Sequence, residues 1–279
     1  MKLTRKFAAC LTMLILFVAV TVFAMPEGID EDWGRGVVRV TGNGVGKAKY
    51  KNNPGQYRLT ARQAARMDAQ RKLSEYVNGV QVTGDAKMED LALEYDVVGT
   101  HTAGLLKNAI DVGEPKYISD GVCEVTMELK LYGGRGSVAE VAFLPFKDEP
   151  KIPFMQPSVN VTVNQSGANY TGLVVDCRGL GELTPVMSPV IKKTDGTKIY
   201  GHENLDYDQI VMSGMASYVE NANDEASRSR AGNNPLTIKA QGLTDINSTP
   251  VVSNDDADRI LAANQKDGFL KNCAVVFVK

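Results

Sequence analysis

The chain has 279 residues, with 31 lysines and arginines against 33 aspartates and glutamates, so its formal net charge is only −2. Hydrophobic residues make up 43% of it, which excludes a disordered or collagen-like chain and allows a sizeable core in one large or two ordinary domains. The near-neutral balance argues against a dedicated nucleic-acid-binding protein, which would be strongly basic.

The first 24 residues have the pattern of a secretory signal peptide. Lys2, Arg5 and Lys6 precede an apolar run over residues 7–25, and small side chains flank a cleavage site after residue 24. We therefore expect residues 1–24 to be removed and the remaining chain to be exported, to the periplasm or to the outer membrane. An uncleaved inner-membrane anchor is the alternative, because the apolar run is somewhat long for a signal peptide.

A glycine-spaced stretch follows the first predicted strand, residues 37–41. Gly42, Gly44 and Gly46 precede Lys47, as glycines precede lysine in some nucleotide-binding loops. A dinucleotide fingerprint needs its third glycine one position later, and a P-loop needs Ser or Thr after the lysine, where this chain has alanine. We therefore interpret the stretch as a bent strand or hairpin, and we predict no cofactor.

A long helix is predicted after a turn at residues 52–55. Thr60 and Gln63 have the spacing of a capping box, so the helix is expected to begin at Thr60 and to end at Asn78 and the glycine after it. Small and apolar side chains recur every four residues on one face: Ala61, Ala65, Ala69, Leu73 and Val77. This alanine-rich face would let the helix lie close against a sheet.

Shorter elements complete the predicted N-terminal domain, residues 35–132. They are a strand at 80–82, a helix over 87–95, and strands over 98–110, 112–118 and 123–131. In the last of these, apolar and polar side chains alternate strictly, which is typical of a strand with one buried and one solvated face.

The rest of the chain divides into a predicted Gly/Pro-rich linker, residues 133–157, and a second domain, residues 158–279. Within the linker, an apolar piece over residues 138–146 is expected to pair with one of the sheets. Elements predicted in the second domain are strands at 173–175, 236–240 and 273–278, a hairpin turning at 194–197, a helix over 207–219, and a helix that begins at Ser253 or Asn254. The fold class is therefore α+β, with a helix packed on an antiparallel sheet followed by a second α+β domain.

The cysteines and histidines offer few catalytic or metal-binding sites. Removal of residues 1–24 leaves Cys123, Cys177 and Cys273, an odd number, and we favour small buried hydrophobic side chains over a disulfide framework. Cys177, which precedes an arginine, is the best candidate nucleophile of a hydrolase, but it would need His101 or His202 as its base. Neither histidine lies in a recognisable catalytic context, so we predict no catalytic and no metal-binding residue.

Basic side chains crowd into one part of the N-terminal domain. Between positions 35 and 72, only Asp68 opposes ten of them: Arg35, Arg39, Lys47, Lys49, Lys51, Arg58, Arg62, Arg66, Arg71 and Lys72. We expect Arg58, Arg62, Arg66 and Lys72 to form a surface for an anionic partner, with an ordinary solvated face as the alternative. Export and the lack of interleaved aromatic residues exclude nucleic acid as that partner.

The N-terminal domain resembles a known family. Its order is a strand with Thr41-Gly42-Asn43-Gly44, then Ala61-Arg62-Gln63-Ala64-Ala65 and Asp68-Ala69-Gln70-Arg71 on the helix, then Gly79-Val80-Gln81-Val82, and finally the strand around Cys123 to Leu131. This pattern is similar to the N-terminal domain of flagellar assembly protein T and to the twenty-kilodalton surface lipoproteins of Gram-negative bacteria. The resemblance implies an exported envelope protein with no enzymatic residues.

Together these observations predict an exported, non-enzymatic cell-envelope protein that acts through contacts with envelope proteins or an anionic envelope surface. A flagellar-ring or secretion-accessory component is the first alternative, and a hydrolase that uses Cys177 is the second. Formation of a homo-oligomer stays open.

Overall fold

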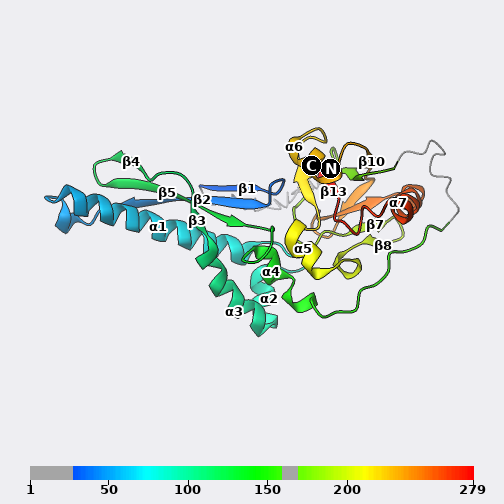
Figure 1. Cartoon of the computed structure of the whole chain (residues 1–279), viewed down its shortest axis with the longest axis horizontal. Helices are drawn as coiled ribbons and strands as arrows, with labels where there is room; N and C mark the ends of the chain where they lie inside the picture. Colours follow the sequence, from blue (N-terminus) through cyan, green and yellow to red (C-terminus); the bar gives the residue numbers. More distant parts are fainter. Residues whose placement is uncertain (1–27, 159–168) are drawn as a thin grey trace, which may run out of the picture.

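The computed structural model describes residues 28–158 and 169–279, so the predicted signal peptide, residues 1–24, lies outside the described residues. The molecule is elongated (Figure 1). An N-terminal unit, residues 28–132, extends away from a rounder second unit, residues 169–279, and the segment 133–158 connects them. The mixture of helices with an antiparallel sheet and then further sheets confirms the predicted α+β class.

The N-terminal unit is built on an antiparallel sheet. Its strands are β1 (Ile29–Asp32), β2 (Val37–Val45), β5 (Val122–Lys130), β3 (Ile110–Asp111) and β4 (Lys116–Ser119), and both β3 and β4 pair with β5. The strict alternation predicted for 123–131 is confirmed, because the side chains of β5 are buried at every second position. The sheet therefore has one face that must be covered.

The helix α1 (Pro54–Gly79) covers that face. Its buried side chains are the five of the predicted ridge: Ala61, Ala65, Ala69, Leu73 and Val77. Gly44 of β2 explains how close the helix lies, since a Cβ atom at this position would come within 2.1 Å of the backbone nitrogen of Ala65. Small residues on both elements thus bring strand and helix into backbone contact.

The start of α1 differs from the prediction. The helix begins at Pro54 and not at Thr60, because the side chain of Asn53 accepts a hydrogen bond from the backbone N–H of Gln56 and proline suits the first helical turn. The hydroxyl of Thr60 instead accepts a bond from the N–H of Lys47, 3.0 Å away. Thr60 therefore does not cap the helix but links it to the segment just after β2.

Two further predictions, for residues 98–110 and 138–146, are wrong. Residues 98–110 are mostly helical, in α3 (Asp96–Leu105), which packs beside α2 (Met88–Glu94). Their β-branched residues resemble a strand locally, but Val98 and Leu105, seven residues apart, share a buried helix face. The apolar piece 138–146 pairs with no sheet and forms α4 (Val138–Ala142) and a short 3-10 turn.

The second unit contains two four-stranded sheets. The first is parallel, in the order β10 (Pro235–Lys239), β6 (Gly172–Asp176), β13 (Val275–Val278), β9 (Ser217–Val219). The second is mixed, in the order β11 (Gly242–Thr244), β12 (Thr249–Val252), β7 (Ile191–Lys193), β8 (Lys198–Tyr200). The predicted hairpin is β7–β8, and the predicted central strand near the C-terminus is β13, buried along its whole length.

Helices complete the second unit: α5 (Tyr207–Ser213), α6 (Glu225–Ala231) and α7 (Asn254–Asp267). The predicted cap of α7 is confirmed, because Ser253 accepts a hydrogen bond from the N–H of Asp256. The helix predicted over 207–219 is wrong after residue 213, and residues 217–219 form the strand β9. The chain leaves α5 at Gly214, whose φ of +66° ends the helix.

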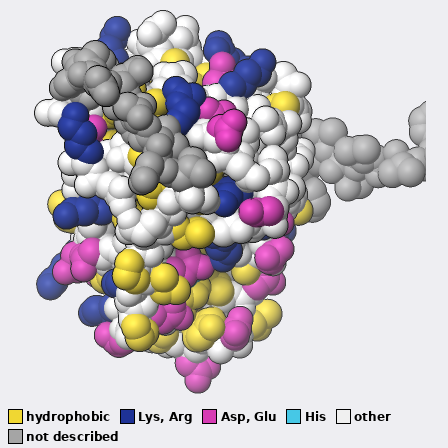
Figure 2. All heavy atoms as spheres, turned by 90° about the vertical axis from the view of Figure 1, so that its right-hand side faces the viewer, with side chains coloured by type: hydrophobic (Ala, Val, Ile, Leu, Met, Phe, Trp, Pro, Cys, Tyr) yellow, Lys and Arg dark blue, Asp and Glu magenta, His cyan; other side chains and the backbone are white. Residues whose placement is uncertain are grey.

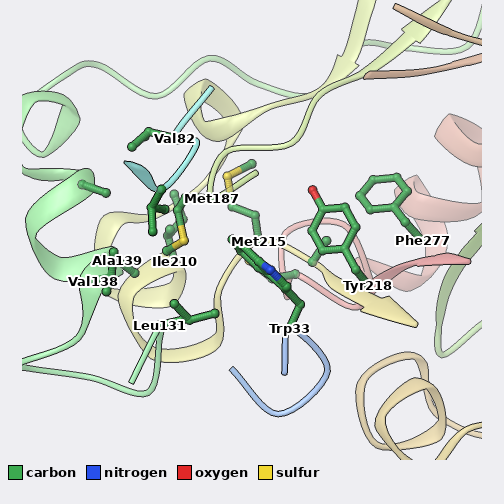
Figure 3. Packing of buried hydrophobic residues seen from close by; sticks show 14 of the residues in the cluster. Trp33, Val82, Leu131, Val138, Ala139, Met187, Ile210, Met215, Tyr218 and Phe277 are labelled. Carbon is green, nitrogen blue, oxygen red and sulfur yellow. The ribbon is translucent and has the colours of Figure 1, made fainter. Parts of the chain in front are cut away.

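One continuous hydrophobic core runs through both units. Trp33, in the turn between β1 and β2, lies near Tyr218 of β9 and Met215, while Val82 lies near Met187 (Figure 3). The backbone also crosses the junction, since the N–H groups of Met187 and Ser188 donate to the carbonyl oxygens of residues 81 and 82 at 3.0 and 2.7 Å. The two units are therefore packed together over several segments.

Residues 80–82 do not form the predicted strand, apart from a single bridge between Gln81 and Lys87. The carbonyl oxygens of Gln81 and Val82 bind the second unit instead, and that of Val80 accepts a hydrogen bond from the N–H of Met88. Within the part of the chain that the structure describes, no helix has the length and apolar character needed to span a membrane.

Candidate functional site

The predicted anionic-partner surface is divided by the structure. Arg58, Arg62 and Arg66 lie one turn apart along α1 and form a stripe on the side that faces β3 and β4, which we call the arginine stripe. Arg66 is 3.2 Å and Arg62 is 4.0 Å from the carboxylate of Asp111 in β3, and Arg58 lies over the ring of Tyr117 in β4. Since three half-exposed arginines have one neighbouring carboxylate between them, the stripe has a net positive charge.

Lys72 does not belong to the arginine stripe. Its ammonium donates to the carbonyl oxygen of Thr41 in β2 at 2.9 Å and lies 3.4 Å from Asp68, and only 13% of its side chain is exposed. The helical spacing contains this information, because position 72 is six residues after 66 and so falls off the i, i+4 row. Lys72 therefore links α1 to β2 and is not part of the surface for an anionic partner.

Asp68 lies on the opposite side of α1 from the arginine stripe and binds several neighbouring groups. Burial alone would raise its pKa, but hydrogen bonds from the backbone N–H of Asn43 and from Arg71, together with Lys72, hold the pKa below its usual value. Asp68, the only acid between positions 35 and 72, thus pairs with Arg71 and Lys72 on the β2 side of α1. It leaves the arginine stripe on the other side unaffected.

The structure contradicts the premise of an activated thiol at Cys177. The side chain is fully buried, and burial, assisted by the charge of Asp176, raises its pKa to about 12. The neighbouring Arg178 is occupied by Asp176, whose pKa it lowers to about 2. Since the thiolate is the nucleophile, a thiol with this pKa is unreactive at neutral pH.

The other two cysteines and the two histidines are spread through the fold. Cys123 and Cys273 are buried like Cys177, as expected for small hydrophobic side chains, and burial raises the pKa of Cys273 to about 11. His202 is buried against Phe146 and its Nδ1 lies 3.0 Å from the hydroxyl of Ser188, so burial lowers its pKa. His101 is exposed on α3 and bonds to its own helix backbone. No base therefore adjoins a reactive thiol among residues 28–158 and 169–279.

A cavity of about 900 Å³ lies where the N-terminal unit meets the second unit, and no motif in the sequence predicts it. The β1–β2 turn contributes Asp32 and Arg35, α6 contributes Glu225 and Arg230, and Ser217 lies at the start of β9. The cavity opens at the amino ends of the parallel strands β9 and β13. Its walls come from sequence positions as far apart as Asp32 and Cys273.

Arg230 is the central side chain of this cavity. Its Nε donates to the hydroxyl of Ser217 at 2.6 Å, one terminal nitrogen donates to the carbonyl oxygens of Gly214 and Cys273 at 3.3 and 3.0 Å, and the other bonds to the carbonyl oxygen of Ser213. These acceptors come from the last residue of α5 and the glycine after it, from the first residue of β9, and from the residue two positions before β13. The guanidinium is thereby fixed in place, and no local sequence pattern marks it.

Tyr132 forms the floor beneath Arg230, whose guanidinium lies 5.2 Å from the centre of the tyrosine ring. A Cβ atom at Gly36 or Gly214 would come within 2.3 or 2.5 Å of that ring, and both glycines have positive φ. The Tyr132 hydroxyl also donates to the carbonyl oxygen of Trp33 at 2.8 Å. The cavity floor is therefore rigid, with one glycine from each unit against it.

Exposed apolar side chains form a further surface feature. In the view from the end formed by the second unit, charges of both signs are interspersed and hydrophobic side chains gather in the lower part (Figure 2). Leu93 of α2 is 87% exposed, and Val97 of α3 and Ile152 of the connecting segment are also exposed. These positions are available for contact with another protein.

Comparison with known proteins finds one related domain. Residues 172–279 match the family model described as the second domain of Treponema pallidum Tp0624. No curated protein matches the chain. The match begins at the first residue of β6 and covers both sheets of the second unit, and it does not reach residues 35–132, on which the resemblance to envelope proteins rests. The second unit is thus similar to a domain of a bacterial protein.

Proposed function

We propose that this chain is an exported, non-enzymatic protein of the bacterial cell envelope that acts through contacts with envelope proteins or an anionic envelope surface. The observation that carries the proposal is the arginine stripe. Arg58, Arg62 and Arg66 are exposed on the part of α1 that extends away from the second unit (Figure 1), and the carboxylate of Asp111 pairs with Arg62 and Arg66 only. Such a stripe attracts anionic surfaces and is screened by salt.

Three other observations support the envelope role. Residues 1–24 have the signal-peptide pattern, the first unit resembles surface lipoproteins and flagellar assembly protein T, and the second unit is similar to a bacterial domain. The burial and raised pKa of Cys177 weigh against the hydrolase alternative.

Cell fractionation with N-terminal sequencing tests this role. The mature protein is expected in the periplasmic or outer-membrane fraction with residue 25 at its N-terminus. Recovery in the inner membrane with residues 1–24 intact would favour the anchored alternative. Recovery in the cytoplasm would end the proposal.

A flagellar-ring or secretion-accessory role is the second candidate, supported by the resemblance of the helix α1 and its sheet to flagellar assembly protein T. In a motile host, deletion of the gene would then abolish swimming or change the composition of purified basal bodies. Unchanged swimming after deletion would leave the general envelope role as the better proposal.

A further inference from the structure

The inter-unit cavity contains a cation that has no acidic partner. A guanidinium has five N–H donors, and four of those of Arg230 bond to a hydroxyl and to carbonyl oxygens, all of them neutral. Across the described residues, no carboxylate forms an ion pair with Arg230, and the side chain is only partly exposed. One donor and the full positive charge therefore remain for a molecule in the cavity.

An anion without a partner lines the same cavity. Glu225, at the start of α6, makes no hydrogen bond or ion pair with any residue in the ranges that the structure describes. The other two charged groups of the cavity, Asp32 and Arg35, are bonded to each other. The cavity thus offers one positive and one negative group without an ionic partner among the described residues. Ser217 and other neutral polar side chains form the rest of its polar lining.

We propose that this cavity binds a short peptide with free termini, whose carboxylate pairs with Arg230 and whose amino group pairs with Glu225. The cavity volume of about 900 Å³ lies within the range of small-molecule sites. The rigid floor of Tyr132 and the fixed guanidinium reduce the entropy lost on binding. A simple anion would satisfy Arg230 and leave Glu225 opposing it, so a zwitterion fits the charges better.

Isothermal titration calorimetry on the purified mature chain tests the proposal with three probes: trialanine, its C-terminal amide and its N-acetylated form. Trialanine is expected to bind saturably. The amide should bind about tenfold more weakly, because it leaves the partly buried charge of Arg230 unpaired. The N-acetylated form should bind about threefold more weakly, as expected for an exposed ion pair.

Variants assign the two ends of the peptide. Glu225→Gln should lower the affinity for trialanine about threefold and should no longer distinguish trialanine from its N-acetylated form. Arg230→Gln should remove the preference for the acid over the amide. Since Arg230 also orders several carbonyls, its variant is tested for folding by circular dichroism, and the exposed Glu225→Gln variant keeps the test decisive if that variant does not fold.

Arg228→Gln is the matched control, because it removes the same charge from an exposed position on α6 that does not line the cavity. Its affinity for all three probes should equal that of the unchanged chain. The proposal is overturned if trialanine shows no saturable binding at millimolar concentration, if acid and amide bind alike, or if Arg228→Gln weakens binding as much as Glu225→Gln does. These measurements use the isolated protein and are independent of its cellular location.

Discussion

The indole ring of Trp33 meets the ring of Tyr218 edge to face, with centroids 5.6 Å apart and ring planes at 74°. Trp33 belongs to the β1–β2 turn of the N-terminal unit, and Tyr218 belongs to the parallel sheet of the second unit. The aromatic contact joins two units that a reading of the sequence alone separates by a linker. It packs the two units against each other at this junction.

Trp33→Ala should lower the free energy of unfolding by about 3 kcal/mol, because it leaves a cavity in the shared core. Urea unfolding followed by circular dichroism measures this change. Trp33 is the only tryptophan of the chain, so its fluorescence in the unaltered protein reports on the junction directly. That fluorescence should change together with the circular dichroism in one transition. Two separate transitions would show that the units unfold independently.

Gly44→Ala should destabilise the N-terminal unit by about 3 kcal/mol, because the added methyl group meets the backbone of α1 at a distance that no side-chain rotation relieves. Gly104→Ala is the matched control, since the same change in α3 meets no atom within 4 Å and favours helix. Relative to the unaltered protein, the melting temperature should fall for Gly44→Ala and rise for Gly104→Ala. Equal melting temperatures for both would contradict the close contact of β2 with α1.

Cys177 should make the protein lose stability in alkali. Its folded pKa of about 12 lies above its ordinary value near 9, so the folded state holds the proton more tightly than the unfolded state. The stabilisation is complete below pH 9 and is lost as the pH rises toward 12. Comparison of the unfolding free energy of the unaltered protein with that of Cys177→Ala across this range isolates the thiol. A parallel pH dependence of the two would refute the raised pKa.

The arginine stripe should bind vesicles of phosphatidylcholine with phosphatidylglycerol more tightly than vesicles of phosphatidylcholine alone. Asp111→Asn should strengthen this binding about twofold or more, because it frees Arg62 and Arg66 from their shared carboxylate. The double change of Arg62 and Arg66 to Gln should weaken it. Vesicle co-sedimentation at low and high salt measures both effects.

Lys239→Gln provides the control for the vesicle experiment, because it removes an exposed charge from β10 in the second unit. It should leave the binding unchanged. If it weakens binding as much as the arginine changes do, the attraction comes from the general charge of the protein and not from the stripe.

Much of the local structure could be predicted from the sequence. The alanine-rich face of α1, the alternation in β5, the β7–β8 hairpin and the Ser253 cap each depend on residues close together in the chain. The errors arose where distant contacts decide. α3 is rich in strand-forming residues and is helical because Val98 and Leu105 are buried together.

The inter-unit cavity lay beyond sequence reasoning for the same reason. Arg230 looks like an ordinary residue near the end of a short helix, and its significance comes from carbonyl groups at positions 213, 214 and 273. The crowding of basic residues between positions 35 and 72 was visible in the sequence. Which of them belong to the arginine stripe, and that Lys72 binds β2 instead, depends on which strand lies on which side of α1.

The position of Tyr132 between two glycines has a mechanical consequence. The helix α1 has 26 residues, so it is a lever about 39 Å long, and the arginine stripe sits toward its outer end. A tilt of about 10° at the tyrosine would displace that end by about 7 Å. The ring of Tyr132 packs against Gly36 of the first unit and Gly214 of the second, so such a tilt would have to separate the ring from one of these glycines, and the second unit thereby sets the direction in which the arginines point. A partner that fixes the orientation of the second unit therefore also fixes the direction in which the arginine stripe faces.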